Sequence, residues 1–579
     1  MLEQIYQDRL AKLEKIRALG IDPYGRRYDT AKPVAEVLKR YEQAGIAGEG
    51  AGEGADADIA GRIILYRDMG KMIFAHLRDQ SGQMQIALRK DQPEKPPPGL
   101  SEEPWTLAKL LDLGDLVAVS GVLHKTRTGE VTVWADQLTL LSKSLAPMPE
   151  KWHGLQDIET RYRQRYLDLM ANPESMAGFF KRFAILDNVR ARLKARGFVE
   201  VETPILQAIY GGAAARPFTT HHNTLDADLF MRISPELYLK RLLVGGMEKV
   251  FEIGRNFRNE GIDTRHNPEF TMLELYQAYA DYEVMMEITE ELVSTSADAC
   301  NTSEELRKKA EQLVADEVRV LKQQEFFQSE LDGLIALAKE KDTGVAEAII
   351  IASREYPTMY AGVLAHFKRG EAQACIEAAR LRDQGRNVLP YGERTIDFSP
   401  PWPRKTYDEL LIEHAGVSMR DPAAVREKAR AIGIETGNKA DAVLAGAVFE
   451  ALVEPALAKC DRPVFVKDYP AELCPLTRRK ADDPSIALRF ELYVAGMEVA
   501  NAYTELNDPT VQEANFRQQL SGEAEGETMR VMDEDFVTAL RHGMPPAGGL
   551  GIGLDRLTML LTNTTSIRDV ILFPMLRKM

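Results

Sequence analysis

The chain has 579 residues, 45% of them hydrophobic and 28% charged, an ordinary composition for a globular protein of roughly three or four domains. Its formal net charge of −15 at pH 7 means that any nucleic-acid binding must come from a local basic surface. We expect a cytoplasmic protein without a membrane span, because there is no apolar run of about 18 residues, the charged N-terminus lacks the apolar core of a secretion signal, and the four cysteines are scattered without CxxC spacing.

The first 145 residues predict helices followed by a small β domain. Residues 1–45 read as one or two amphipathic helices, and residues 45–58 contain almost only Gly, Ala and acids, which favours a linker. Five short alternating strands between residues 59 and 141 indicate a β-barrel, with a small β-sandwich as the alternative. The proline-rich stretch 93–99 predicts a rigid surface loop. We therefore place domain boundaries at 1–58 and 59–145.

The rest of the chain predicts an α+β region with a helical insertion. A polar hinge (146–178) precedes a long amphipathic helix (179–197), and strands and helices then alternate to about residue 302 and again over 391–579. Residues 303–390 have helical composition, and Thr302 with Glu305 predicts a capping box at their start. We interpret this insertion as a packing or solvated arm, with an RNA or partner contact as the alternative.

Residues 255–276, RNFRNEGIDTRHNPEFTMLELY, carry the strongest chemical signal. They combine three arginines, a histidine and three glutamates with an apolar strand pattern. Guanidinium groups suit phosphates and ionised carboxylates suit an ammonium group, so the segment predicts a site for a polyphosphate and a cation together. The alternative is a solvated, salt-bridged hairpin, which the apolar residues disfavour.

Two further patterns lie near the C-terminus. A glycine-rich strand, GGLGIG, leads into a helix at Asp555 and Arg556, which places an arginine where a phosphate would bind; tight strand–helix packing is the alternative. Glu491 and Glu498 lie in one apolar run, and a bulge at Gly496 would bring them to the same strand face as Mg²⁺ ligands; separate salt bridges are the alternative.

Several long motifs in order resemble the class II aminoacyl-tRNA synthetases, and specifically the bacterial type that activates lysine. They are GFVEVETP (197–204), FRNEG…RHNPEFTMLELY (257–276) and GLGIGLDR (549–556), supported by GGAAARPF, ISPELYLKRL, YPAELCPLTRR and ELND. The resemblance implies a five-stranded OB-fold anticodon-binding barrel, a catalytic domain (179–302 and 391–579) built on an antiparallel sheet flanked by helices, and a homodimer with Pro204 at its interface.

The same resemblance implies the nucleotide site. Arg258 would bridge the α-phosphate and the amino-acid carboxylate, while Phe270 would stack on adenine opposite Arg556, which would pin the γ-phosphate. Mg²⁺ would be held by Glu491 and Glu498. The residues expected at ATP are Arg258, Glu260, Arg265, His266, Phe270, Glu491 and Arg556.

The resemblance also implies an amino-acid site. Selecting aspartate would require cations where glutamates stand, so the acids favour lysine. Its residues would be Gly212, Glu236, Arg258, Glu274, Tyr276, Asn501 and Glu505. Ala502 and Gly548 depart from the family pattern, and we expect them to alter the volume of the pocket or its affinity.

The expected partner is tRNA(Lys), read by the barrel. Phe74 is a candidate base-stacking platform and Glu130 a candidate base-edge acceptor, although a strand Phe is core by default. The predicted function is ATP-dependent ligation of lysine to tRNA; the alternatives are a lysyltransferase acting on a protein and a non-catalytic binding paralogue.

Overall fold

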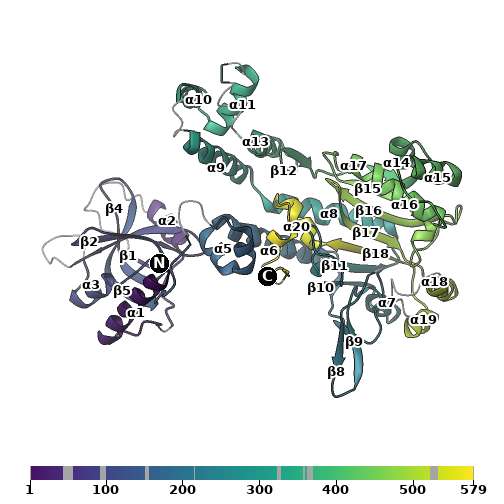
Figure 1. Cartoon of the computed structure of the whole chain (residues 1–579), viewed down its shortest axis with the longest axis horizontal. Helices are drawn as coiled ribbons and strands as arrows, with labels where there is room; N and C mark the ends of the chain where they lie inside the picture. Colours follow the sequence, from purple (N-terminus) through teal and green to yellow (C-terminus); the bar gives the residue numbers. More distant parts are fainter. Residues whose placement is uncertain are drawn as a thin grey trace. The chain divides into compact units, whose positions relative to one another are not determined.

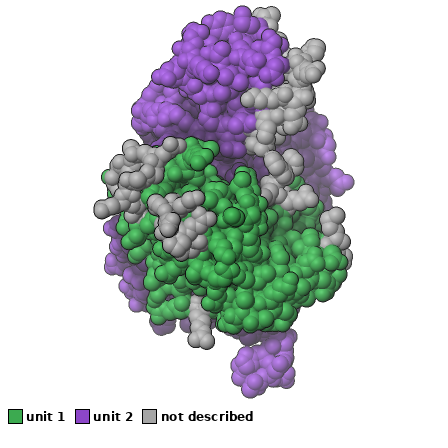
Figure 2. Space-filling view, turned by 90° about the vertical axis from the view of Figure 1, so that its left-hand side faces the viewer, with its two compact units in different colours: residues 1–172 green, residues 173–579 purple. Residues whose placement is uncertain are grey.

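A computed structural model describes residues 2–25, 27–43, 56–90, 99–149, 155–213, 215–321, 328–356, 359–360, 369–521 and 532–577. Of the expected linker at 45–58 only residues 56–58 lie in this described part, and of the loop at 93–99 only Gly99 does. The chain divides into unit 1, Met1–Asn172, and unit 2, Pro173–Met579, which Figure 2 shows in different colours. The division falls inside the expected hinge.

Unit 1 contains a closed five-stranded barrel with the order β1-β2-β3-β5-β4, which confirms the predicted barrel (Figure 1). Along β2, alternate residues Ile73, Ala75 and Leu77 are fully buried, as the period of a half-buried strand requires. The strands are β1 Asp56–Asp68, β2 Met72–Arg78, β3 Gln83–Arg89, β4 Leu116–Lys125 and β5 Val131–Ser142.

The helices of unit 1 include α1 Leu2–Ala18, α2 Val34–Gln43 and α3 Glu102–Ala108. They pack on the barrel, because Ile16, Val34 and Trp105 belong to the same hydrophobic cluster as the barrel strands. The N-terminal helices and the barrel therefore share one core. Helices α4 Ile158–Arg163 and α5 Arg165–Ala171 follow in the expected hinge.

Unit 2 is built on an eight-stranded sheet with the order β14-β15-β16-β17-β18-β11-β10-β6. Neighbouring strands run antiparallel except at the two edges, where β14–β15 and β10–β6 are parallel. The strands are β6 Val199–Glu200, β10 Lys249–Phe257, β11 Glu269–Ala278, β14 Arg404–Thr406, β15 Val464–Pro470, β16 Ile486–Val494, β17 Met497–Thr504 and β18 Ala547–Gly553.

Two helix layers cover the sheet of unit 2. Helices α6 Pro173–Ala195, α8 Tyr282–Cys300 and α20 Leu554–Leu561 share one core with the central strands. Helices α14 Tyr407–Ala415, α15 Pro422–Ala431 and α16 Asp441–Leu452 share another with β15 and β16. Helix α6 starts earlier than the expected residue 179, with proline at its first position, where the missing N–H costs nothing.

Shorter elements complete the surroundings of the site. Helix α7 Glu236–Val244 packs with α19 Glu534–Arg541 in a smaller core, and α18 Pro509–Ser521 precedes α19. The others are β7 Leu206–Gln207, β8 Thr219–His222, β9 Ala227–Met231, α17 Glu454–Leu457, the short 3-10 helix η2 Ala471–Leu473 and α21 Ile567–Val570.

The predicted helical insertion is present in unit 2 as α9 Ser303–Leu321, α10 Gln328–Glu340, α11 Val345–Glu355 and α13 Arg369–Asp383, followed by the hairpin β12 Val388–Tyr391 and β13 Arg394–Asp397. The predicted capping box is confirmed, because Glu305 N donates to Thr302 Oγ1 at 3.1 Å and Thr302 N donates to Glu305 Oε2 at 2.7 Å. The insertion has its own apolar cluster around Leu331, Leu334 and Ala352.

The structure corrects the expected strand geometry around Glu491 and Glu498. They do not share one strand bulged at Gly496: Ala495 and Gly496, with φ of 51° and 77°, form the turn between β16 and β17. Glu491 pairs with Asn501 and Tyr493 with Glu498 across this hairpin, so both glutamates still reach the same sheet face. None of the helices in the described part combines the length and apolar character needed to cross a bilayer.

Candidate active site

The segment 255–276 forms the hairpin of β10 and β11 and the loop between them. Leu273 and Leu275 are fully buried in the sheet core, so the solvated-hairpin alternative does not hold for β11. Arg258 follows directly after β10, where its N–H donates to Pro268 O at 2.8 Å and its guanidinium lies 5.1 Å from the centre of the Phe270 ring. The hairpin thus places an arginine and an aromatic ring side by side.

The larger cavity on this sheet has a volume of about 680 Å³. Its wall combines acidic, cationic and aromatic side chains from β11, α7, β16 and β17. Of the residues expected at an amino-acid site, Gly212, Glu236, Arg258, Glu274, Tyr276 and Asn501 line it. Glu472, Arg489, Tyr503 and Asp533, which the sequence did not single out, line it too.

Glu274 is the buried carboxylate of this wall without an ion-pair partner among the described residues. It is 5% exposed and accepts from Ser234 Oγ at 2.8 Å and from the Tyr276 hydroxyl at 3.4 Å. Burial, with the charge of Glu236, raises the pKa of Glu274 to about 8. Its cross-strand neighbour Glu252 instead forms an ion pair with Arg232. Glu274 is therefore a buried acid that a cationic ligand would stabilise.

Glu505 is close to this wall but does not line the cavity. It is 1% exposed, and its Oε2 lies 2.5 Å from the ammonium of Lys240, which also donates to Glu236 Oε1 at 2.6 Å. Burial is the largest influence on the pKa of Glu505 and raises it. Lys240 lowers this pKa and Glu236 raises it further, and the result is a pKa of about 7. The sequence analysis missed Lys240. Its signal was a lysine one turn after Glu236 among the buried leucines of α7.

A second cavity of about 200 Å³ gathers the residues expected at ATP except Glu491, which lines neither cavity. Arg556 donates to Glu498 O at 2.9 Å, and its other terminal nitrogen lies 3.1 Å from His266 Nε2. Both cavities are lined by Arg258 and Asn501, so the two cavities adjoin each other. The expected residues on the second wall are Arg258, Glu260, Arg265, His266, Phe270, Glu498 and Arg556.

Glu491 and Glu498 have the chemistry of a partial metal site. Glu491 Oε2 accepts from the hydroxyls of Tyr469 and Tyr493 at 2.8 Å each, and Oε1 pairs with Arg489. Burial and the nearby charge of Glu491 raise the pKa of Glu498. A cation bound between Glu491 and Glu498 would lower this pKa again. Groups of three or more metal-binding side chains are absent from the described residues. Each glutamate also has its own arginine, Glu491 with Arg489 and Glu498 with Arg556 at 3.6 Å, as the alternative of separate salt bridges predicted. Two carboxylates on one face nevertheless match what Mg²⁺ takes from a protein, since phosphates and water complete its shell.

The glycine-rich strand β18 allows close approach on the cavity side. A Cβ at Gly549 would stand 2.0 Å from Glu505 Oε1, and one at Gly551 would stand 3.2 Å from Asn501 Oδ1. The expected effect of Ala502 and Gly548 on the pocket is not what the geometry shows. Ala502 is buried in the core on the opposite sheet face, and a Cβ at Gly548 would meet Asp281 O at 2.7 Å. Neither residue lines either cavity.

Pro204, the expected interface residue, lies in an exposed segment after β6. Its neighbours Ile205 and Leu206 expose 44% and 50% of their surfaces, and Val199 exposes 52%. Contiguous exposed apolar side chains are typical of an interaction surface.

In unit 1, the two candidate anticodon residues come from one face of the barrel. Phe74 packs edge-on against Trp134 with ring centres 6.3 Å apart, and it is half-buried. The carboxylate of Glu130 lies 2.9 Å from His76 Nε2 and accepts from Gln85 Nε2 at 2.7 Å. Gln85 and His76 are polar neighbours that the sequence analysis missed, because strand alternation alone does not show which residues meet across a barrel.

Comparisons with known proteins agree with this geometry. The family described as tRNA synthetases class II (D, K and N) matches residues 157–577, and the OB-fold nucleic acid binding domain matches residues 57–141. The chain is 43% identical over 583 residues to the lysine–tRNA ligase of Pelotomaculum thermopropionicum, with 100% of this chain and 95% of the relative covered. It is 42% identical over 582 residues to that of Carboxydothermus hydrogenoformans, with 100% and 98% covered.

Proposed function

This chain belongs to the class II tRNA synthetases of the D, K and N group, and from that premise we propose that it ligates L-lysine to tRNA(Lys) through a lysyl-adenylate, at the expense of ATP. The observation that carries the choice of lysine is the wall of the larger cavity, where the buried carboxylates of Glu236 and Glu274 face the ligand space. An aspartate side chain would meet like charge there, whereas an ammonium group relieves it.

The first step joins the lysine carboxylate to the α-phosphorus of ATP. A carboxylate oxygen attacks in line, an O–P bond forms, and the bond to the bridging oxygen of pyrophosphate breaks. The nucleophile is already ionised, so no general base is needed and catalysis is positioning with charge neutralisation. Arg258 lines both cavities and would hold the carboxylate against the α-phosphate, with Arg556 and His266 toward the outer phosphates.

Glu491 and Glu498 would hold Mg²⁺, which when bound neutralises phosphate charge. Phe270, on the wall of the smaller cavity, would stack on adenine.

In the second step a terminal ribose hydroxyl of tRNA attacks the lysyl carbonyl, and AMP leaves with the electron pair of the broken bond. Phe74, Gln85 and Glu130 are the proposed anticodon contacts, with stacking and base-edge hydrogen bonds as their roles.

We further propose a homodimer formed through the exposed apolar segment around Pro204, and a cytoplasmic location, where tRNA and ATP are available.

Glu236 and Asn501, with Gly212 at a positive φ of 84°, would receive the α-amino group of lysine.

Pyrophosphate exchange into ATP tests the proposal, run in parallel with lysine, aspartate, asparagine and arginine. We expect exchange with lysine alone. Exchange with no amino acid would favour a non-catalytic binding protein, and exchange with aspartate would reverse the charge argument. Charging of unfractionated tRNA then distinguishes tRNA from a protein as the acceptor.

A further inference from the structure

Lys240 is a buried cation inside the acidic wall. Its residue surface is 0% exposed, and its ammonium lies 2.6 Å from Glu236 Oε1, 2.5 Å from Glu505 Oε2 and 5.8 Å from the centre of the Tyr276 ring. A lysine without water contact must be compensated by carboxylates, so these three groups form one electrostatic unit.

This unit continues to Glu274 through Ser234. The Ser234 hydroxyl donates to Glu274 Oε1 at 2.8 Å and accepts from the backbone N–H of Glu236 at 3.1 Å. The cluster therefore holds the carboxylates of Glu236, Glu274 and Glu505 and the ammonium of Lys240. With every group ionised, two negative charges remain, and free lysine carries two ammonium groups. Its carboxylate is left for Arg258, which lines the same cavity.

The two oxygens of Glu505 have different surroundings. Oε2 lies 2.5 Å from the ammonium of Lys240, and both oxygens are buried without a hydrogen bond of good geometry among the described residues. Oε1 lies on the side of Gly549, where a Cβ would also stand 2.5 Å from a ring atom of Tyr276. Tyr276 itself lines the cavity. Lys240 thus holds one oxygen, and the other packs beside Gly549 and Tyr276, whose side chain lines the amino-acid pocket.

We infer that Lys240 is a positioning residue that matches the charge of the amino-acid pocket to a diammonium substrate, by neutralising one of its three carboxylates and holding Glu236 and Glu505 in place. This inference rests on the proposed lysine activation and deepens it. A lysine that only stabilised the core would alter the stability of unit 2 and leave the selection of the amino acid unchanged.

The test compares Lys240→Met in two backgrounds, with pyrophosphate exchange giving separate KM values for lysine and ATP. In the wild-type background, Lys240→Met leaves the two buried carboxylates of Glu236 and Glu505 without their ammonium. We expect the KM for lysine to rise on the order of 100-fold with little change in the KM for ATP. In the Glu505→Gln background, the same substitution restores two negative charges to the cluster. There we expect it to lower the KM for lysine relative to Glu505→Gln alone.

The KM for lysine should thus rise in one background and fall in the other, and this opposite response distinguishes charge matching from packing. A structural role predicts a change in the same direction in both backgrounds, and that result would overturn the inference, as would a wild-type KM for lysine in Lys240→Met. If Lys240→Met alone does not fold, the comparison of Glu505→Gln with the double variant decides. The double variant leaves one buried carboxylate, Glu236, without its ammonium, whereas Lys240→Met alone leaves two, Glu236 and Glu505. Lys143→Met, a buried lysine of unit 1, is the matched control and should leave the KM for lysine unchanged.

The proposed function fails separately. If the wild-type protein does not exchange pyrophosphate with lysine, lysine activation itself is wrong. If the wild-type protein does so but the reversal is absent, only the role of Lys240 is wrong.

Discussion

Two buried lysines in this molecule each stand between two carboxylates. In unit 1, Lys143 lies 2.7 Å from Asp112 and 2.8 Å from Asp115, with a side chain that is 0% exposed. In unit 2, the equally buried Lys240 lies between Glu236 and Glu505 at 2.6 and 2.5 Å. The local pattern is the same, yet the surroundings of the carboxylates differ.

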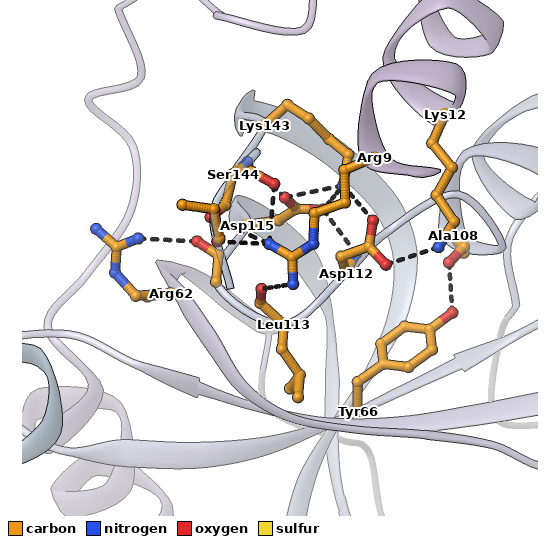
Figure 3. A network of polar contacts seen from close by, with 12 residues as sticks. Arg9, Lys12, Arg62, Tyr66, Ala108, Asp112, Leu113, Asp115, Lys143 and Ser144 are labelled. Atoms are coloured by element: carbon orange, nitrogen blue, oxygen red, sulfur yellow. Dashed lines mark hydrogen bonds and ion pairs between the residues drawn. The ribbon is translucent and has the colours of Figure 1, made fainter. Parts of the chain in front are cut away.

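The carboxylates around Lys143 are satisfied by their own chain (Figure 3). Asp115 also accepts the backbone N–H groups of Asp112 and Ser144 at 2.7 Å each, and Asp112 accepts from Lys12 at 2.6 Å. Burial would raise the pKa of Asp112, but the bonds from Lys12 and Lys143 outweigh it and hold the pKa below its usual value. A fully satisfied cluster of this kind stabilises a fold.

The cluster around Lys240 is incomplete by comparison. Burial raises the pKa values of Glu505 and Glu274 to about 7 and about 8. The single ammonium of Lys240 does not offset this effect for all three carboxylates of the cluster. In these two clusters, the carboxylates outnumber the ammonium groups only around Lys240, where the acids Glu236 and Glu274 line a cavity. Four experiments test this distinction.

Lys143→Met should have the largest effect, on stability alone. It leaves Asp112 and Asp115 without their shared buried cation, and removing one partner of such a pair costs about 3–5 kcal/mol. Denaturant unfolding followed by tryptophan fluorescence should show unit 1 unfolding earlier. Unchanged stability, or a raised KM for lysine in the folded variant, would remove the contrast between the two clusters.

Glu274→Gln should weaken lysine activation. Hydrogen bonds to charged groups contribute about 1.5–3 kcal/mol, so the KM for lysine should rise roughly 10- to 150-fold while the KM for ATP stays the same. Its cross-strand neighbour Glu252 is the matched control, because it is neutralised by Arg232 and does not line either cavity. Equal losses for lysine and ATP in Glu274→Gln would show that the ammonium site lies elsewhere.

The KM for lysine should fall as pH rises through neutrality. Glu274 and Glu505 have pKa values raised to about 8 and about 7, so they hold protons in the empty site below those values and must release them to bind ammonium. One such proton changes the KM by at most about tenfold per pH unit. Pyrophosphate exchange at about pH 6.5 and 7.5 measures this, and Glu274→Gln should flatten the profile. A KM that rises over this interval would contradict the assignment.

Lys12→Ala should have the smallest effect. Lys12 is the outer cation of the unit 1 cluster, with a side chain 34% exposed, and such pairs contribute about 0.2–1 kcal/mol. Unfolding of unit 1 in denaturant measures the loss. If Lys12→Ala lowers the stability of unit 1 as much as Lys143→Met does, the difference in solvent exposure between Lys12 and Lys143 does not determine how much each contributes.

Much of the fold was predictable from local patterns. Strand β2 of the barrel alternates buried and partly buried residues, and the glycine-rich strand β18 leads directly into α20, where Arg556 stands. The nucleotide residues from Arg258 to Phe270 lie in one short segment, so their meeting in one cavity followed from sequence proximity and family resemblance. Their roles there remain predictions.

Other features were decided by contacts between distant segments. The turn at Ala495 and Gly496 was misread as a bulge, because a short apolar run does not reveal where one strand ends and the next begins. Ala502 and Gly548 lie at positions that face away from the cavity, and the register between β17 and β18 decides this. Registers follow from pairing across the sheet, and each one-residue shift reverses the face.

The sequence alone determined the class of protein, the order of its elements and the residues that carry charge, because periodicity and motif spacing are local properties of the chain. Only the tertiary structure decided that Lys240 neutralises Glu505, while Glu274 has no ion-pair partner within the part of the chain that the structure describes. The physical reason is that the energy of a buried charge depends on its neighbours in space and on the exclusion of water, and a linear sequence specifies neither.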